Sequence, residues 1–559
     1  MLRRPFLIAL ALLTLAALVP AGTATASEPA DLVLLNATVH TVDPKRARAE
    51  AVAVRGNRIV AVGTSAEIQA YVGPRSRVMD LRGRTVVPGF DDAHAHFLGI
   101  GFARLDVDLV GTGTFDDVVA RVEKAVKART PGEWIRGRGW DQNDWADTRF
   151  PSHEALSLAV PNNPVYLTRV DGHAALVNAK ALEAAGVTAS TQDPDGGRFI
   201  RDDRGSPTGV LIDRAQGVVS RVIPPESRDE IKAATLAAIA EANRWGLTGI
   251  HDAGVSPAVI AVYEELARAG QYNLRNYVMV RADEPTLDSV MRVGRRLAVN
   301  DRLWIRSIKI TADGALGSRG AALLEDYSDE PGNRGLITAD SGYTRRVAAK
   351  ALRNGFQLNI HAIGDRANRS VLDIYQDALR EVPTADHRFR IEHAQILRYQ
   401  DLPRFAELGV IPSMQGSHQT SDMYWVPNRI GWSRSQGAYA WRSLLNTGVV
   451  IPNGSDFPVE AVNPLISFRA FFTRTDADGF PAGGWFPGER TTRDEALLSI
   501  SMWPAYAAFM EDVSGSLTPG KYADLVVLDQ DIMTVEERRL LDTQVLMTVL
   551  GGKIVYRRN

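Results

Sequence analysis

The chain has 559 residues, of which 45% are hydrophobic, 23% charged and 7% aromatic, as is typical of globular proteins. This length predicts two to three domains, or one large domain and a smaller one. The formal net charge of −2 shows no excess of basic residues of the kind that binds nucleic acid, so we expect no nucleic-acid partner. Because the sequence contains no Cys, it excludes disulfides, thiolate metal ligands and a lipid anchor on an N-terminal Cys.

The first residues, MLRRPFLIALALLTLAALVPAGTATAS, have the features of a secretory signal peptide over residues 1–26. Arg3 and Arg4 precede an apolar run over residues 6–19, and the small-x-small sequence ATA at 24–26 is a cleavage site. No second hydrophobic span follows, so we expect export and no stable membrane span after signal removal. RRPFL matches part of the twin-arginine pattern and the leucine-rich run suits the general secretory route, so the route stays open.

Short alternating runs rich in β-branched residues occur at both ends of the mature chain. Antiparallel strands are predicted for ADLVLLNATVHTV, AVAVRGNRIVAVG and SRVMDLRGRTVVPGF near the N-terminus. The same alternation of apolar and polar residues occurs near the C-terminus in YADLVVLDQDI and VLMTVLGGKIVYR. ADLVLLN and ADLVVLD are nearly the same, and chain ends commonly lie close together. We therefore expect residues 30–87 and 515–559 to form one small composite β-sandwich.

Between these ends, apolar runs alternate with helical stretches such as SRDEIKAATLAAIAEANRWG, an order that predicts an α/β fold with a parallel sheet. Seven strands are clear: TVVPGF, LTGIHDAG, SIKITADG, FQLNIHAIGD, RFRIEHAQI, GVIPSMQ and VVIPNGSDFPV. An eighth is ambiguous between EWIRGRGWD and PVYLTRVDGH. Eight strands favour a (β/α)8 barrel over residues 88–514. The interval of about 101–224 is too long for one or two β/α units, so we expect an inserted subdomain there.

The stretch VPGFDDAHAHF places two histidines one residue apart at the end of the first of these strands. Side chains at i and i+2 of a strand face the same way, so His94 and His96 would project together. A metal ion is the commonest reason for two imidazoles to converge. Two unrelated surface histidines in a loop would give the same local pattern. The polar residues on the other strands are needed to distinguish this alternative from a metal site.

Four further strands carry polar residues at or near their C-terminal ends, where a (β/α)8 barrel places its chemistry. These residues are Lys309, His361, His393 and Asp456. With His94 and His96, four of the ten histidines of the chain lie at predicted strand ends, and Asp456 lies at another. This concentration favours a metal site over independent structural roles for each residue.

Lys309 is the unusual member because an ammonium group repels a metal. It either pairs with an acid such as Asp313, or burial keeps its amine neutral. A neutral lysine can add carbon dioxide to form a carbamate, whose two oxygens can bridge two metal ions. The sequence alone does not decide between these alternatives.

The motifs VPGFDDAHAHF, SIKITADGALGSRGA, LNIHAIGDRAN, IEHAQIL and NGSDFPV occur in this order, and the chain thereby resembles the amidohydrolase superfamily. RVDGHAALVNAKAL and MQGSHQTSD fit its extended branch, which includes N-substituted formamide deformylases. The resemblance covers nearly all of the mature chain. It implies a (β/α)8 barrel with a composite β-sandwich and a metal centre that hydrolyses C–N bonds. Asp91 departs from the apolar residue usual at its position.

The resemblance also implies a role for each polar residue at the strand ends. His94, His96 and Asp456 would bind a first metal, His361 and His393 a second, and carboxylated Lys309 would bridge the two. Asp456 would also act as general base and then general acid. These ligands suit zinc, with manganese, iron or cobalt as alternatives.

The expected substrate is a small amide, such as an N-substituted formamide or another N-acyl amine. His173 and His418 are candidates for binding it, and each suits a structural loop role equally well. Trp140 lies in a stretch that we expect to rim the barrel mouth, where aromatic side chains suit an apolar N-substituent. Packing between the insert and the barrel would explain any single aromatic residue there as well.

Other functions fit parts of the same pattern. A cyclic amide hydrolase and a ring-amidine deaminase of the same superfamily are alternatives, and because such deaminases usually lack the bridging lysine, Lys309 counts against a deaminase. An exported metal- or ligand-binding protein without catalysis is an alternative from another class, and the acid/base role implied for Asp456 counts against it. The sequence leaves open whether the protein is a homo-oligomer.

Overall fold

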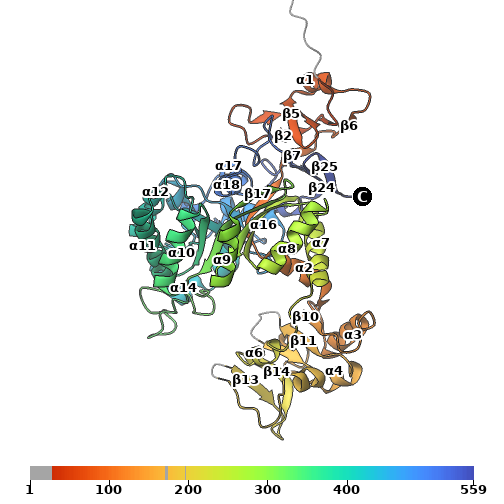
Figure 1. Cartoon of the computed structure of the whole chain (residues 1–559), viewed down its shortest axis with the longest axis vertical. Coiled ribbons are helices and arrows are strands. Elements are labelled where there is room, and N and C mark those ends of the chain that lie inside the picture. The colour runs from red at the N-terminus through yellow and green to blue at the C-terminus, as the bar shows by residue number, and fades with distance from the viewer. Residues whose placement is uncertain (1–27, 170–173, 195–196) are drawn as a thin grey trace, which may run out of the picture.

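The computed structural model describes residues 28–169, 174–194 and 197–559 (Figure 1). The signal peptide expected over residues 1–26 and the candidate His173 lie outside these residues. In Figure 1 the two sheets built from the chain ends lie at one end of the long axis, the barrel and its helices lie in the middle, and the insert forms a lobe at the other end.

The first part of the structure consists of two sheets to which both ends of the chain contribute. One sheet has the order β5-β4-β1-β6 and the other the order β25-β24-β23-β7-β2-β3. Val526 of β23 lies opposite Val87 of β7, so a C-terminal strand pairs directly with an N-terminal one. The strands are β1 Leu32–Leu35, β2 Thr38–His40, β3 Arg48–Ala49, β4 Ala51–Arg55, β5 Arg58–Gly63, β6 Arg77–Asp80, β7 Thr85–Pro88, β23 Leu525–Leu528, β24 Val545–Leu550 and β25 Lys553–Arg557, with the short helices α1 Ser65–Ile68 and η1 Gln69–Tyr71.

The central part is a (β/α)8 barrel whose eight strands are all parallel. Its strand order is β22-β21-β20-β19-β18-β16-β15-β8. The strands are β8 Phe90–Ala95, β15 Leu247–Val255, β16 Arg275–Arg281, β18 Leu303–Thr311, β19 Gln357–Ala362, β20 Arg390–His393, β21 Ile411–Gln415 and β22 Asn453–Gly454, and β17 Arg296–Val299 pairs antiparallel with β18. The N–H of Asp456 donates to the carbonyl of His94, and that of His96 to the carbonyl of Phe457, each at 2.8 Å. These bonds bring the two ends of the sheet together.

The third barrel strand, Arg275–Arg281, differs from both sequence candidates for the eighth strand. EWIRGRGWD and PVYLTRVDGH instead form the neighbouring strands β10 Ile135–Trp140 and β11 Val165–Arg169 of the insert. The run RNYVMVR has only four consecutive apolar residues, which explains why its pattern is weak. Its terminal charges are paired at opposite ends of the strand, Arg275 with Asp524 and Arg281 with Asp283.

The helices around the barrel cover its outer face. α7 begins with a capping box, in which Ser227 accepts from the N–H of Glu230 and the Glu230 carboxylate accepts from the N–H of Ser227. The helices are α2 Phe97–Leu105, α7 Arg228–Arg244, α8 Pro257–Arg268, α9 Glu284–Val293, α10 Ser341–Arg353, α11 Asp365–Glu381, η3 Tyr399–Asp401, α12 Leu402–Leu408, α13 Gly416–Asp422, α14 Val426–Ser435, α15 Trp441–Leu445, α16 Pro464–Thr473, η4 Pro487–Glu489, α17 Arg493–Ser499, α18 Met502–Ala507 and η5 Glu537–Asp542. None of the described helices is both long and apolar enough to cross a membrane.

The insert lies between α2 and α7 and has its own hydrophobic core around a six-stranded sheet of order β13-β14-β12-β11-β10-β9. Its remaining elements are β9 Val107–Asp108, α3 Phe115–Val126, η2 Gln142–Asp144, α4 Glu154–Ala159, β12 Ala174–Val177, α5 Ala179–Ala184, β13 Gly197–Arg201, β14 Pro207–Asp213 and α6 Gln216–Ser220. The expectation that Trp140 lies in a loop at the barrel mouth is wrong. Trp140 ends β10 fully buried in this core, and its indole N–H donates to the carbonyl of Leu167 at 2.9 Å.

Candidate metal centre

Three of the expected ligands converge where the last barrel strand meets the first. Asp456 Oδ1 lies 3.2 Å from His96 Nε2 and 3.6 Å from His94 Nε2. Ligand atoms about 2.1 Å from a zinc ion in tetrahedral geometry lie roughly 3.4 Å apart, so these distances suit a shared metal. Asp456 Oδ1 is also buried and accepts no hydrogen bond from the described residues, despite its two imidazole neighbours. A buried carboxylate oxygen without a hydrogen bond lowers the stability of the fold unless a cation lies beside it. The three residues therefore fit a metal ion.

His94 is held in place by a buried ion pair that the sequence analysis missed. Its Nδ1–H donates to Glu392 Oε2 at 2.5 Å, so the lone pair is on Nε2, which faces His96, Asp456 and Lys309. Glu392 Oε1 in turn lies 2.7 Å from Arg390 Nε, and all three side chains are fully buried. The guanidinium of Arg390 also donates to the carbonyl of Ala93 and to Ser413 Oγ. The available signal was Arg390 and Glu392, two opposite charges one residue apart on the buried strand Arg390–His393.

His393 shows the same arrangement on the neighbouring side of the site. Its Nδ1–H donates to Gln415 Oε1 at 2.7 Å, so Nε2 carries the lone pair. The rings of His361 and His393 are 4.5 Å apart between centroids. His361 Nε2 is buried and has no hydrogen-bond partner among the described residues. Gln415 ends β21 and was a second residue that the sequence analysis missed.

Lys309 faces the same centre. Its Nζ lies 3.2 Å from His94 Nε2, and no described carboxylate lies within 4 Å of it. Asp313 is not its partner, because this side chain instead accepts the backbone N–H groups of residues 322, 363 and 364. Burial lowers the pKa of Lys309 to about 8, which favours the neutral amine that carbamate formation requires.

The protonation states of His94, His361 and Asp456 suit metal binding. Burial, assisted by Lys309, lowers the pKa of His94 to about 4 and that of His361 to about 3, so both imidazoles are neutral at pH 7. Burial alone would raise the pKa of Asp456, but His96 and the other nearby imidazoles hold it well below its usual range. His393 and Asp456 have left-handed backbone angles, with φ of 75° and 61°. Strain of this kind is concentrated at functional sites.

A cavity of about 510 Å³ opens onto the centre. Its wall includes the apolar side chains of Leu316, Ile363 and Trp425 and the carboxylates of Asp422 and Glu460. Its floor is formed by His96, Lys309, His361, His393 and Asp456. Of the expected substrate-binding residues, His418 in the first turn of α13 lines this cavity, and Trp140 does not.

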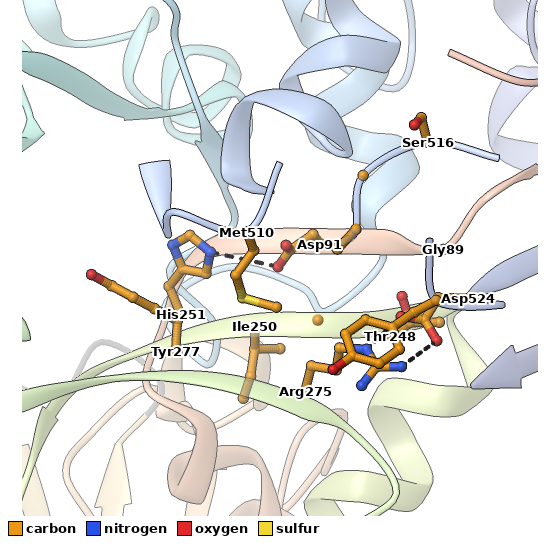
Figure 2. Close-up of a pocket in the computed structure, with 14 residues that line it drawn as sticks. Gly89, Asp91, Thr248, Ile250, His251, Arg275, Tyr277, Met510, Ser516 and Asp524 are labelled. Carbon is orange, nitrogen blue, oxygen red and sulfur yellow. Dashed lines mark hydrogen bonds and ion pairs between the residues drawn. The ribbon is translucent and has the colours of Figure 1, made fainter. Parts of the chain in front are cut away.

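A second cavity lies at the opposite end of the barrel and is shown in Figure 2. Its volume of about 10 Å³ has room for about one water molecule and none for a substrate. Asp91 and His251 point toward each other there, with Asp91 Oδ1 3.7 Å from His251 Nε2. His251 Nδ1 accepts from Arg390, so the cavity lies at the base of the ion pair that orients His94. Asp91, whose side chain is unusual in the sequence pattern, is therefore the first of a series of buried polar side chains in contact with one another. The series continues through His251, Arg390 and Glu392 to His94.

Comparison with known proteins identifies the family of this chain. An amidohydrolase family model matches residues 77–556. Protein LONG AFTER FAR-RED 3 of Arabidopsis thaliana is 34% identical over 94% of this chain and 92% of its own length. An N-substituted formamide deformylase of Arthrobacter pascens is 31% identical over 94% and 98%. The structure of a metal-dependent hydrolase from Pyrococcus furiosus superposes with a TM-score of 0.77 at 27% identity, covering 90% of this chain and all of the other. The chain therefore belongs to the amidohydrolase family and is a metal-dependent hydrolase that acts on carbon–nitrogen bonds.

Proposed function

We propose that this protein hydrolyses the amide bond of N-substituted formamides or other small N-acyl amines, and that it does so after export from the cytoplasm. The observation that carries the proposal is the convergence of His94, His96 and the unpartnered Oδ1 of Asp456 next to a cavity of small-molecule size, which His96 and Asp456 line. The similarity to an N-substituted formamide deformylase over nearly the whole of both chains supports this substrate class. Export rests on the signal-peptide features of residues 1–26.

His94, His96 and Asp456 would hold a first divalent ion, for which zinc is the best match to ligands without sulfur. His361 and His393 would hold a second, with carboxylated Lys309 as the bridge. A bound ion supplies Lewis-acid activation of the carbonyl and of water.

Asp456 has the position and charge for the proton transfers. The carboxylate is ionised at neutral pH, so it can take a proton from the attacking water. Returned to the amide nitrogen, the same proton makes the amine a better leaving group. The apolar wall around Trp425 would bind the N-substituent and exclude competing water.

The test is a substrate panel with the zinc-loaded protein. Formamides with alkyl and aromatic N-substituents, longer N-acyl amines, cyclic amides and ring amidines would be compared through release of acid, amine or ammonia. The proposal expects formate or another acid together with a free amine from the open-chain amides. Turnover confined to ring amidines, with release of ammonia, would refute it in favour of a deaminase. Turnover confined to cyclic amides would refute it in favour of a cyclic amide hydrolase.

A further inference from the structure

We infer that His418 is a further ligand of the second ion, beside His361 and His393, and that Asp456 reaches both ions through its two carboxylate oxygens. The ligand atoms of these three residues all lie within 4.8 Å of one another. Oδ1 of Asp456 faces His94 and His96, whereas Oδ2 faces His418 Nε2 at 3.7 Å. The inference rests on the metal-dependent function above and adds a ligand to it.

The ring nitrogens that face this second site are free to bind. His393 uses its Nδ1–H for Gln415, so its Nε2 has a lone pair available. His418 Nε2 is buried and has no hydrogen-bond partner among the described residues. The two rings are nearly parallel, at 6° with centroids 5.9 Å apart, and both stand beside Asp456.

His418 is held beside Asp456 by the turn that follows the end of β21. β21 ends at Gln415 and passes directly into α13, so the same turn supplies the partner of His393 and the His418 ring. Gly416 makes this turn possible, because a Cβ at this position would lie 2.6 Å from the carbonyl oxygen of Ser467. α13 can therefore lie close to α16 and hold His418 over the barrel mouth.

The spacing favours a metal over a hydrogen bond. At 3.7 Å, His418 Nε2 is too far from Asp456 Oδ2 for a hydrogen bond. Two ligands of one tetrahedral zinc lie roughly 3.4 Å apart, close to this distance. The widest pair of the triplet must approach by at most about 1.4 Å to reach that spacing. With His361 and carboxylated Lys309, these three residues would offer the second ion nitrogen and oxygen ligands only, a set that suits zinc, cobalt or manganese.

Metal stoichiometry tests this inference without relying on catalysis. Apoprotein would be dialysed against cobalt and analysed for bound metal, with His418→Ala and His418→Gln compared to wild type. We expect two equivalents in wild type and one in each variant. Manganese-loaded wild type should show the electron paramagnetic resonance signal of a spin-coupled pair, and the variants an isolated ion. His153→Ala, on the insert and bonded to Ser157, is the matched control and should keep two equivalents.

Either of two results would overturn the inference. One is a wild type that binds a single equivalent. The other is a folded His418 variant that keeps both ions and shows only a raised KM, which would make His418 a substrate-binding residue. Circular dichroism would establish folding of the variants. Wild type that binds two ions but hydrolyses no amide would refute the proposed function and leave this inference standing.

Discussion

Replacing Glu392 by Gln should separate the orientation of a metal ligand from the stability of the barrel. Glu392 is fully buried between Arg390 and His94, and its carboxylate accepts from His94 Nδ1–H at 2.5 Å. Although burial alone would raise the pKa of Glu392, Arg390 and His94 hold it well below its usual range, so the group is charged. Loss of such a partner typically weakens metal affinity about 10–100-fold. Leaving Arg390 buried without its counterion should also cost about 3–5 kcal/mol of unfolding free energy.

The two effects require separate measurements. Zinc affinity would be measured by competition with a chelator, and stability by denaturant unfolding of the apoprotein. Arg390→Met combined with Glu392→Gln removes the lone charge, so it should recover part of the lost stability while zinc affinity stays low. Glu325→Gln is the matched control, because Glu325 pairs with Arg398 at the surface and should affect neither quantity. A Glu392→Gln protein that binds zinc as tightly as wild type would refute the role assigned to this carboxylate.

Four further predictions concern other residues of the barrel. Asp456→Asn should lower kcat by about 10²–10⁴-fold in steady-state assays of metal-loaded protein, and near-normal kcat would make Asp456 structural. Reconstitution of apoprotein should depend on bicarbonate, and Lys309→Ala should abolish that dependence; a bicarbonate-independent wild type would argue against the carbamate. Because burial raises the pKa of Asp91 to about 7 from 3.8, wild-type stability should fall as pH rises through that range, and Asp91→Asn should gain Tm relative to wild type there; a constant difference in Tm would contradict this. Trp425→Ala should raise KM for aromatic amides more than for alkyl amides, and equal changes would remove Trp425 from the substrate site.

The positions of the candidate ligands could be predicted because each depends on residues close to it in the sequence. The i, i+2 spacing of His94 and His96 fixes their common direction on a strand. His393 ends β20 and Asp456 follows β22 by two residues, and parallel strands of a barrel bring such ends to one face. Closure of the sheet between β22 and β8 then places Asp456 against the two histidines.

Other features depend on contacts between distant segments and were missed. Arg275–Arg281 and Ile135–Trp140 both contain apolar residues, but only pairing decides which one enters the barrel: the first pairs with β15 and β18, and the second with β9 and β11. The burial of Trp140 follows from the separate core of the insert. Glu392 and Gln415 act on histidines through side-chain contacts, and no spacing in the sequence encodes the pairing of residues 298 positions apart, as for His94 and Glu392.

A zinc titration of the apoprotein tests the central claim most directly, with bound metal and amide hydrolysis measured on the same samples. The account predicts that amine release rises with bound zinc in wild type. It also predicts that His94→Ala combined with His96→Ala neither fills the first site nor hydrolyses the amide. Full activity in metal-free wild type, or in the double variant, would contradict the claim that these residues form a hydrolytic metal centre.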